Sequence, residues 1–164
     1  MEISLEQLLE SRDARGRVQR AMLEENPLST LVCLTVVMPG SVKRNEDSLA
    51  VARAATLALE EAFPGCEIVR RDLQTGYEAY LLTPLSPLTT KSITCSIEET
   101  HPLGRLFDLD VMGRDGVPVD RSEVGLQPRR CLLCGKGARE CMRARTHSIE
   151  ELTGHIHEMV NAYV

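Results

Sequence analysis

The order of apolar segments between residues 31 and 111 is the feature that most constrains the fold. Short runs rich in β-branched residues, of which LVCLTVV is the clearest, predict strands. Longer runs in which apolar residues recur at helical spacing predict helices between them. The expected elements are strands at 31–37, 66–72, 78–82 and 105–111 and helices at 45–63 and 87–99. This β-α-β-β-α-β order predicts an α+β fold, a split antiparallel sheet with helices packed on one face.

Two capping boxes add a helix at each end of the chain. Ser4 with Gln7 predicts a helix that runs to about Glu25, and Ser148 with Glu151 predicts a C-terminal helix. The length of 164 residues suits one domain spanning 1–164. A hairpin signal at 113–116 predicts a further short strand at 117–120, and the basic, cysteine-rich segment 121–147 has weak periodicity within that domain.

Charge is distributed unevenly along the chain, whose net charge is −5. Between Gln127 and His147 there are six basic residues and one acid, so this stretch carries +5. A local basic patch on an acidic chain with 3% aromatic residues argues against nucleic-acid binding and favours a small polyanion or an acidic protein partner.

Apolar runs and cysteine usage indicate a cytoplasmic protein that does not bind membranes. No run approaches the roughly 20 apolar residues that cross a bilayer, and the N-terminus lacks the apolar core of a signal peptide. Six cysteines in a chain of 164 residues favour reduced thiols or metal ligands over a disulfide scaffold.

The stretch HPLGRLFDLDV at 101–111 places two acids on an otherwise apolar strand. Asp108 and Asp110 share one side of that strand, and their mutual repulsion is relieved by a cation such as Mg²⁺. A D-x-D pair of this kind suits phosphoryl or nucleotidyl transfer. The alternative is a solvated strand face, on which Asp alternating with apolar residues is ordinary.

The register of the hairpin at 113–116 decides whether a third acid joins the pair. A two-residue loop places odd-numbered residues, including Arg121, on the face of the aspartates. A three-residue loop, with Gly116 at positive φ, instead sets Asp120 opposite Asp110. The sequence leaves both registers open.

The segment RRCLLCGKGARECMRARTH at 129–147 combines metal-ligand and anion-binding residues. Cys131, Cys134, Cys141 and His147 could close a structural zinc site, or they are reduced cysteines in a basic loop. Nearby arginines can hold phosphate oxygens through bidentate hydrogen bonds, or they form a solvated face. These arginines are Arg139, Arg143 and Arg145.

Four motifs together resemble the apo-citrate lyase phosphoribosyl-dephospho-CoA transferases (citrate lyase holo-acyl-carrier-protein synthases). They are SRDAR at 11–15, MPGSVK at 38–43, HPLGRLFDLDV at 101–111 and CLLCGKGARECMRARTH at 131–147. The resemblance implies transfer of a phosphoribosyl-dephospho-CoA group from triphosphoribosyl-dephospho-CoA to a serine of the citrate lyase acyl carrier (gamma) subunit, with release of pyrophosphate.

Carried onto this chain, the resemblance implies Asp108 and Asp110 as Mg²⁺ ligands. It assigns phosphate contacts to Lys43, Arg105, Arg139, Arg143 and Arg145, and acid–base or phosphate roles to His101 and His147. An acidic carrier could dock on the basic segment. Two alternatives stay open: a nucleotidyltransferase with another nucleotide or acceptor, and a non-catalytic, zinc-stabilised binding module.

Overall fold

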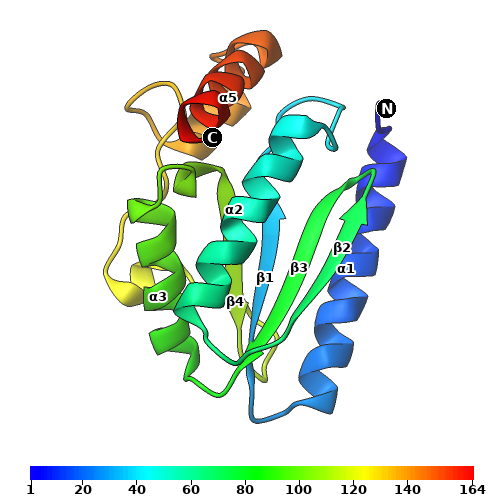
Figure 1. The fold of residues 1–164 in the computed structure, drawn as a ribbon, viewed down its shortest axis with the longest axis vertical. Coiled ribbons are helices and arrows are strands. Elements are labelled where there is room, and N and C mark those ends of the chain that lie inside the picture. The colour runs from blue at the N-terminus through cyan, green and yellow to red at the C-terminus, as the bar shows by residue number, and fades with distance from the viewer.

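A four-stranded antiparallel sheet lies at the centre of the computed structural model, which describes residues 1–164 (Figure 1). The strands are β1 (Thr30–Val36), β2 (Ile68–Leu73), β3 (Gly76–Thr83) and β4 (Phe107–Met112). The helices are α1 (Leu5–Glu25), α2 (Glu46–Ala62), α3 (Pro87–Thr100), α4 (Ala138–Ala144) and α5 (Ile149–Tyr163). The strand order β2-β3-β1-β4 confirms the predicted α+β class with a split antiparallel sheet. None of the helices is long and apolar enough to span a membrane.

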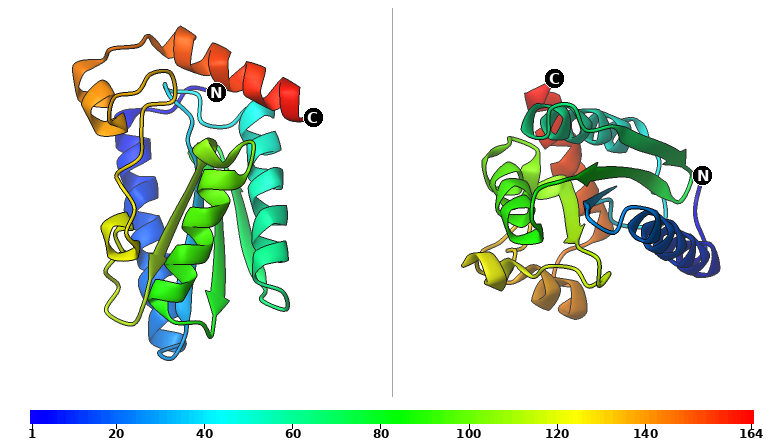
Figure 2. Two further views of the ribbon diagram at one scale, coloured as in Figure 1. Left: turned by 90° about the vertical axis from the view of Figure 1, so that its left-hand side faces the viewer. Right: turned by 90° about the horizontal axis from the view of Figure 1, so that it is seen from below.

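The sheet has a helix-covered apolar face and a second face on which α1 lies (Figure 2). On the first face, Leu34, Leu109 and Val111 are buried in a cluster shared with α2, α5 and the turn after α3. On the second face, Leu31 and Tyr80 are buried with residues of α1 in a smaller cluster. Because successive strand residues alternate between faces, Phe107, Leu109 and Val111 anchor β4 while its two aspartates face the side of α1.

The helices begin where the sequence predicts, but of the two predicted capping boxes only the one at Ser4 is complete, whereas the one at Ser148 makes one of its two bonds. Ser4 and Gln7 make a reciprocal capping box at α1, and the Ser148 hydroxyl accepts a hydrogen bond from the amide of Glu151 at α5. Pro87 occupies the first position of α3 after the cap Ser86. Local sequence therefore sets the helix starts.

The predicted strand at 117–120 is wrong, because only a single bridge, Met112 with Pro118, pairs this stretch with β4. Pro118 has no amide proton to extend the pairing. The register is that of the three-residue loop, with Gly116 at φ 71°. Asp120 turns away to cap the short 3-10 helix Arg121–Val124, where its carboxylate accepts hydrogen bonds from Ser122.

Candidate functional site

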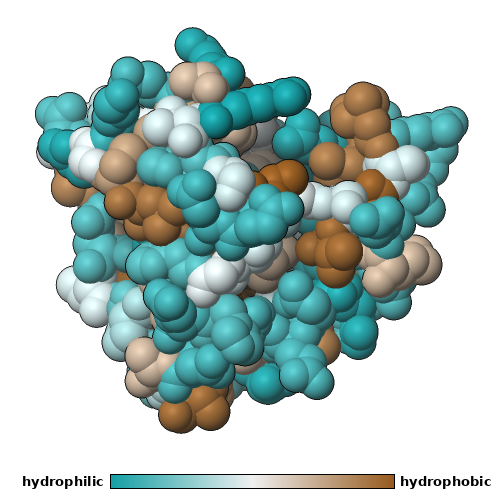
Figure 3. All heavy atoms as spheres, turned by 90° about the horizontal axis from the view of Figure 1, so that it is seen from above, coloured by the Kyte–Doolittle hydropathy of each residue, from teal (hydrophilic) through white to brown (hydrophobic).

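A cleft of about 910 Å³ opens between the start of α1, the C-terminal end of β1 and the start of α5. Figure 3 views this end of the molecule, where both hydrophilic and hydrophobic side chains surround a hollow. Segments far apart in the sequence meet here, including all four motifs that carried the family resemblance. Five basic side chains line the cleft, Arg12, Arg15, Lys43, Arg105 and Arg145, against two acids, Glu78 and Asp108.

Asp108 and Asp110 lie two residues apart on β4, so both side chains project from the sheet face that carries α1. Asp108 pairs across the sheet with Thr35, whose hydroxyl lies 3.4 Å from its Oδ2, and Asp110 pairs with Cys33. Asp108 lines the cleft, whereas Asp110 lies two residues farther along the strand, outside the cleft lining and exposed to solvent.

The electrostatics of this pair favour a bound cation. Desolvation by the surrounding protein, followed by repulsion from Asp108, raises the pKa of Asp110 to about 6. The residue nevertheless keeps an edge exposed to solvent. A carboxylate that is accessible but costly to ionise is suited to accept a divalent cation.

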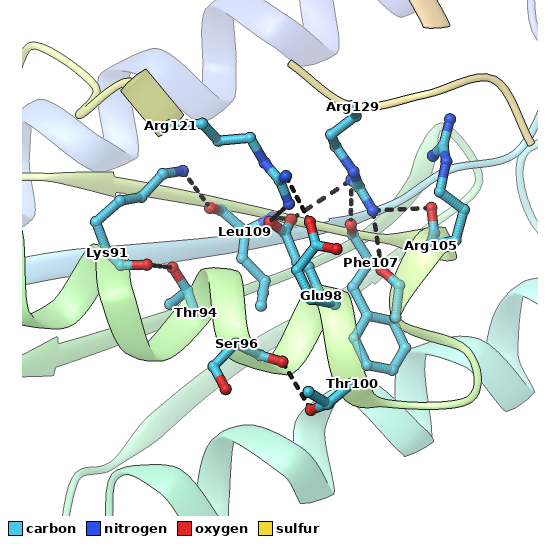
Figure 4. A network of polar contacts seen from close by, with 12 residues as sticks. Lys91, Thr94, Ser96, Glu98, Thr100, Arg105, Phe107, Leu109, Arg121 and Arg129 are labelled. Atoms are coloured by element: carbon cyan, nitrogen blue, oxygen red, sulfur yellow. Dashed lines mark hydrogen bonds and ion pairs between the residues drawn. The ribbon is translucent and has the colours of Figure 1, made fainter. Parts of the chain in front are cut away.

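Side chains close the outer edge of β4, where no fifth strand pairs (Figure 4). The buried Glu98 carboxylate accepts a hydrogen bond from the Leu109 amide at 3.1 Å, and Lys91 donates to the Leu109 carbonyl at 3.3 Å. Arg129 donates to the Phe107 carbonyl at 2.6 Å. These bonds satisfy backbone groups that an edge strand otherwise exposes, so they hold the aspartate strand in place.

Glu98 is itself held by two arginines, which makes it the centre of this network. Its oxygens lie 3.0 Å from Arg121 and 3.4 Å from Arg129, and its side chain is 3% exposed. Arg129 also donates to the carbonyls of Gly104 and Arg105. Arg129 thus serves the fold and is not a free surface charge.

Gly104 allows the turn after α3 to pass close to that helix. A Cβ atom at this position would lie 2.3 Å from the carbonyl oxygen of Glu98 and 2.7 Å from that of Ile97. The glycine in HPLGR therefore sets the approach of β4 to α3, which positions Arg105 at the cleft.

Glu78 is a buried acid that lines the cleft and that no motif in the sequence indicated. Its side chain lies 3.3 Å from Arg15 and 3.6 Å from Arg71, and it accepts a hydrogen bond from the Tyr80 hydroxyl at 2.6 Å. The spacing of Arg12 and Arg15 is the same as that of basic residues on any solvated helix face, so it did not indicate a site. The only sequence signal for these two residues was the SRDAR motif.

Lys43 reaches the cleft from the loop after β1. Its ammonium donates to the Met38 carbonyl at 2.6 Å. Burial, with a smaller contribution from nearby Arg12, lowers the pKa of Lys43. Cations brought together in this way repel each other, and a bound polyanion would relieve that repulsion.

The other candidate site residues from the sequence fall into two groups, those that line the cleft and those that lie outside it. Arg105, Arg145 and His147 line the cleft with Lys43, whereas Arg139 and Arg143 are exposed on α4 outside it. His101 stacks against Phe107 and Tyr163, and its Nδ1 accepts a hydrogen bond from the Leu103 amide. Phe107 lies on the face opposite the aspartates, so His101 is remote from them.

Three cysteines and a histidine gather beside the cleft in a group that can hold a metal ion such as zinc. The ligand atoms of Cys131, Cys134, Cys141 and His147 all lie within 4.8 Å of one another. Cys141 and His147 also line the cleft. The predicted ligand set therefore comes together in space.

The fold and the cleft define a class: an α+β protein whose mixed-charge cleft is of the kind found in transferases of phosphorylated groups. Comparison with known proteins identifies the family within that class. A family model for the apo-citrate lyase phosphoribosyl-dephospho-CoA transferases matches residues 3–163. The chain therefore belongs to this family and is a transferase, which confirms the resemblance seen in the four motifs.

Individual relatives agree with the family model. A probable apo-citrate lyase phosphoribosyl-dephospho-CoA transferase of Vibrio cholerae is 38% identical over 172 residues, covering 99% of this chain and 94% of its own length. The transferase of that name from Escherichia coli O6:K15:H31 is 35% identical over 97% of this chain and 89% of its own length. Protein CitXG of Haemophilus influenzae is 36% identical over 96% of this chain, which spans 35% of that longer protein.

Proposed function

We propose that this chain transfers the phosphoribosyl-dephospho-CoA group from triphosphoribosyl-dephospho-CoA to a serine of the apo-citrate lyase acyl carrier subunit and releases pyrophosphate. Family membership supports the reaction class. The observation that carries the proposal is the cleft itself, which five cations and only two acids line in a protein of net charge −5. A triphosphate is a ligand of matching charge.

Asp108 and Asp110 would hold Mg²⁺ in this reaction. The pair fits the ion, because both carboxylates lie on one sheet face, and desolvation together with repulsion from Asp108 raises the pKa of Asp110, a cost that a bound cation would offset. When bound, the ion neutralises charge on the transferred phosphate. Burial of Phe107, Leu109 and Val111 fixes the strand, so the carboxylates keep their positions when substrate arrives.

Basic residues around the aspartates would bind and orient the triphosphate. Arg12, Lys43 and Arg145 approach from three separate segments and can contact different phosphate oxygens. The carrier serine oxygen forms a bond to the innermost phosphorus, the bond from that phosphorus to the pyrophosphate oxygen breaks, and the hydroxyl proton is lost to solvent. Arginines stabilise the charge that develops on the leaving pyrophosphate.

The exposed side of α4 would receive the carrier subunit. Arg139 and Arg143 project from this helix with Met142, which is 76% exposed and also lines the cleft. An acidic carrier docked there would bring its serine to the cleft mouth. Arg129 is excluded from the docking surface, because its guanidinium is committed to backbone carbonyls and Glu98.

Intact-mass measurement tests the proposed reaction. The protein is mixed with apo carrier subunit, triphosphoribosyl-dephospho-CoA and Mg²⁺, and the carrier should gain the mass of one phosphoribosyl-dephospho-CoA group with one pyrophosphate released. A carrier whose serine is replaced by alanine should stay unmodified. No mass gain under conditions in which an established family member modifies the same carrier would refute the proposal.

A further inference from the structure

The cysteine–histidine group beside the cleft has the geometry of a closed four-ligand metal site. Its four ligand atoms lie within 4.8 Å of one another, and the Sγ atoms of Cys134 and Cys141 are 3.4 Å apart. Tetrahedral zinc with Zn–S bonds of about 2.3 Å requires sulfur–sulfur distances of about 3.8 Å. The group needs only small side-chain adjustments to meet this geometry.

The backbone around Cys131 and Cys134 is shaped as a thiolate-binding turn. The amides of Leu133 and Cys134 donate to the sulfur of Cys131, and the amide of Lys136 donates to that of Cys134. The Cys131 amide closes the turn on the Lys136 carbonyl at 2.7 Å. Amide donors aimed at sulfur stabilise thiolate, the form that binds metal.

His147 is oriented to complete the set. Its Nε2 is buried without a hydrogen-bond partner, while its Nδ1 lies 3.7 Å from a Glu151 carboxylate oxygen. Metal-bound histidines commonly direct their second ring nitrogen toward a carboxylate. A buried nitrogen left without a partner is costly, and a metal ion at the centre of the group would satisfy it.

We propose that Cys131, Cys134, Cys141 and His147 bind one structural Zn²⁺ ion. Three thiolates and one imidazole fill a tetrahedral shell with no position open to substrate, and soft sulfur ligands select zinc over the Mg²⁺ proposed at the aspartates. The ion would tie the turn at 131–136 to α4 and to the start of α5. This part of the chain supplies Arg145 and His147 to one wall of the cleft.

Metal analysis of the full-length protein tests the site without reference to activity. Protein washed with a weak chelator should retain about one zinc per chain. Cys134→Ser should weaken zinc binding by about tenfold or more, whereas Cys66→Ser, a free cysteine outside the group, should keep full occupancy.

A second measurement on the unaltered protein remains informative if the cysteine variant fails to fold. Co²⁺ added to metal-free protein should give the visible spectrum of a tetrahedral ion and a thiolate charge-transfer band, both displaced by Zn²⁺. Absence of bound zinc together with absence of that band would overturn the proposal. A Cys134–Cys141 disulfide, seen as the loss of two hydrogens in intact mass of freshly purified protein, would also overturn it.

Discussion

Asp110 is costly to ionise in the folded protein, and its proposed role as a metal ligand would account for that cost. Its folded-state pKa of about 6 lies above the ordinary Asp value of 3.8. The folded protein therefore holds a proton more tightly than the unfolded chain, so stability falls as pH rises from about 4 to about 6. Such a cost persists in native proteins mainly at functional sites.

Asp110→Asn should therefore stabilise the metal-free protein at neutral pH. We expect a gain of about 1 kcal/mol at pH 7, reduced from the full pKa effect because solvent screens the exposed edge of the side chain. Most of the gain should be lost by pH 4, where the folded carboxyl is protonated and the unfolded one is close to its own midpoint of 3.8. Thermal unfolding of both proteins from pH 4 to pH 8 measures it, and a constant difference across that range would contradict the assigned pKa.

The same substitution should impair transfer, as should Asp108→Asn. Each removes a proposed Mg²⁺ ligand, so the transfer rate should fall by roughly 100-fold or more. In addition, Mg²⁺ should raise the melting temperature of the wild-type protein but not of the variants. Asp115→Asn, in the exposed loop after β4, is the matched control. Near-normal transfer by both site variants would exclude the metal-pair assignment.

Among the secondary-structure elements, β4 is an edge strand whose outer backbone groups are hydrogen-bonded by side chains and not by a neighbouring strand. Glu98→Gln removes the charge that two arginines share and should lower the free energy of unfolding by about 3 kcal/mol. Glu99→Gln is the control, because Glu99 is 55% exposed and contacts only Arg121, so its loss should cost well under 1 kcal/mol. Urea denaturation measures both, and equal effects would show that the Glu98 network does not hold the strand.

The helix α4 offers a test of carrier docking. The double variant Arg139→Glu and Arg143→Glu should raise the KM for the carrier by about tenfold or more, because like charges then face an acidic partner. The KM for the triphosphoribosyl substrate should change little, since both residues lie outside the cleft. Arg17→Glu with Arg53→Glu, exposed on α1 and α2, makes the same charge change elsewhere. If this control raised the KM equally, net charge and not α4 would govern docking.

At the scale of the whole molecule, the cleft is an assembly of distant segments. Arg12 and Arg15 come from α1, Lys43 from the loop after β1, Glu78 from β3 and Arg145 from the loop before α5. Motifs in the sequence indicated Asp108, Arg105, Lys43 and Arg145. Glu78 could not be found in this way, because a lone acid on a strand carries no local signal and its ion-pair partner Arg15 is 63 residues away.

The same separation of scales explains which predictions the structure corrected. Helix starts depend on caps and periodicity within short windows, so Ser4, Ser86 and Ser148 set them locally. The stretch 117–120 failed as a strand because Pro118 limits pairing and Asp120 finds a nearer partner in Ser122. The acid–base or phosphate role suggested for His101 stays a prediction, and its packing against the Tyr163 ring is visible only after folding.

By itself, the sequence determined the α+β class, the acidic pair on one face of a strand, the four-ligand set and the family, because each of these depends on neighbours along the chain. Only the tertiary structure decided which basic residues face Asp108, that Arg129 supports the sheet edge, and that Glu78 lies under the cleft. These outcomes depend on packing between distant segments, where burial and the pairing of charges determine the position of each side chain.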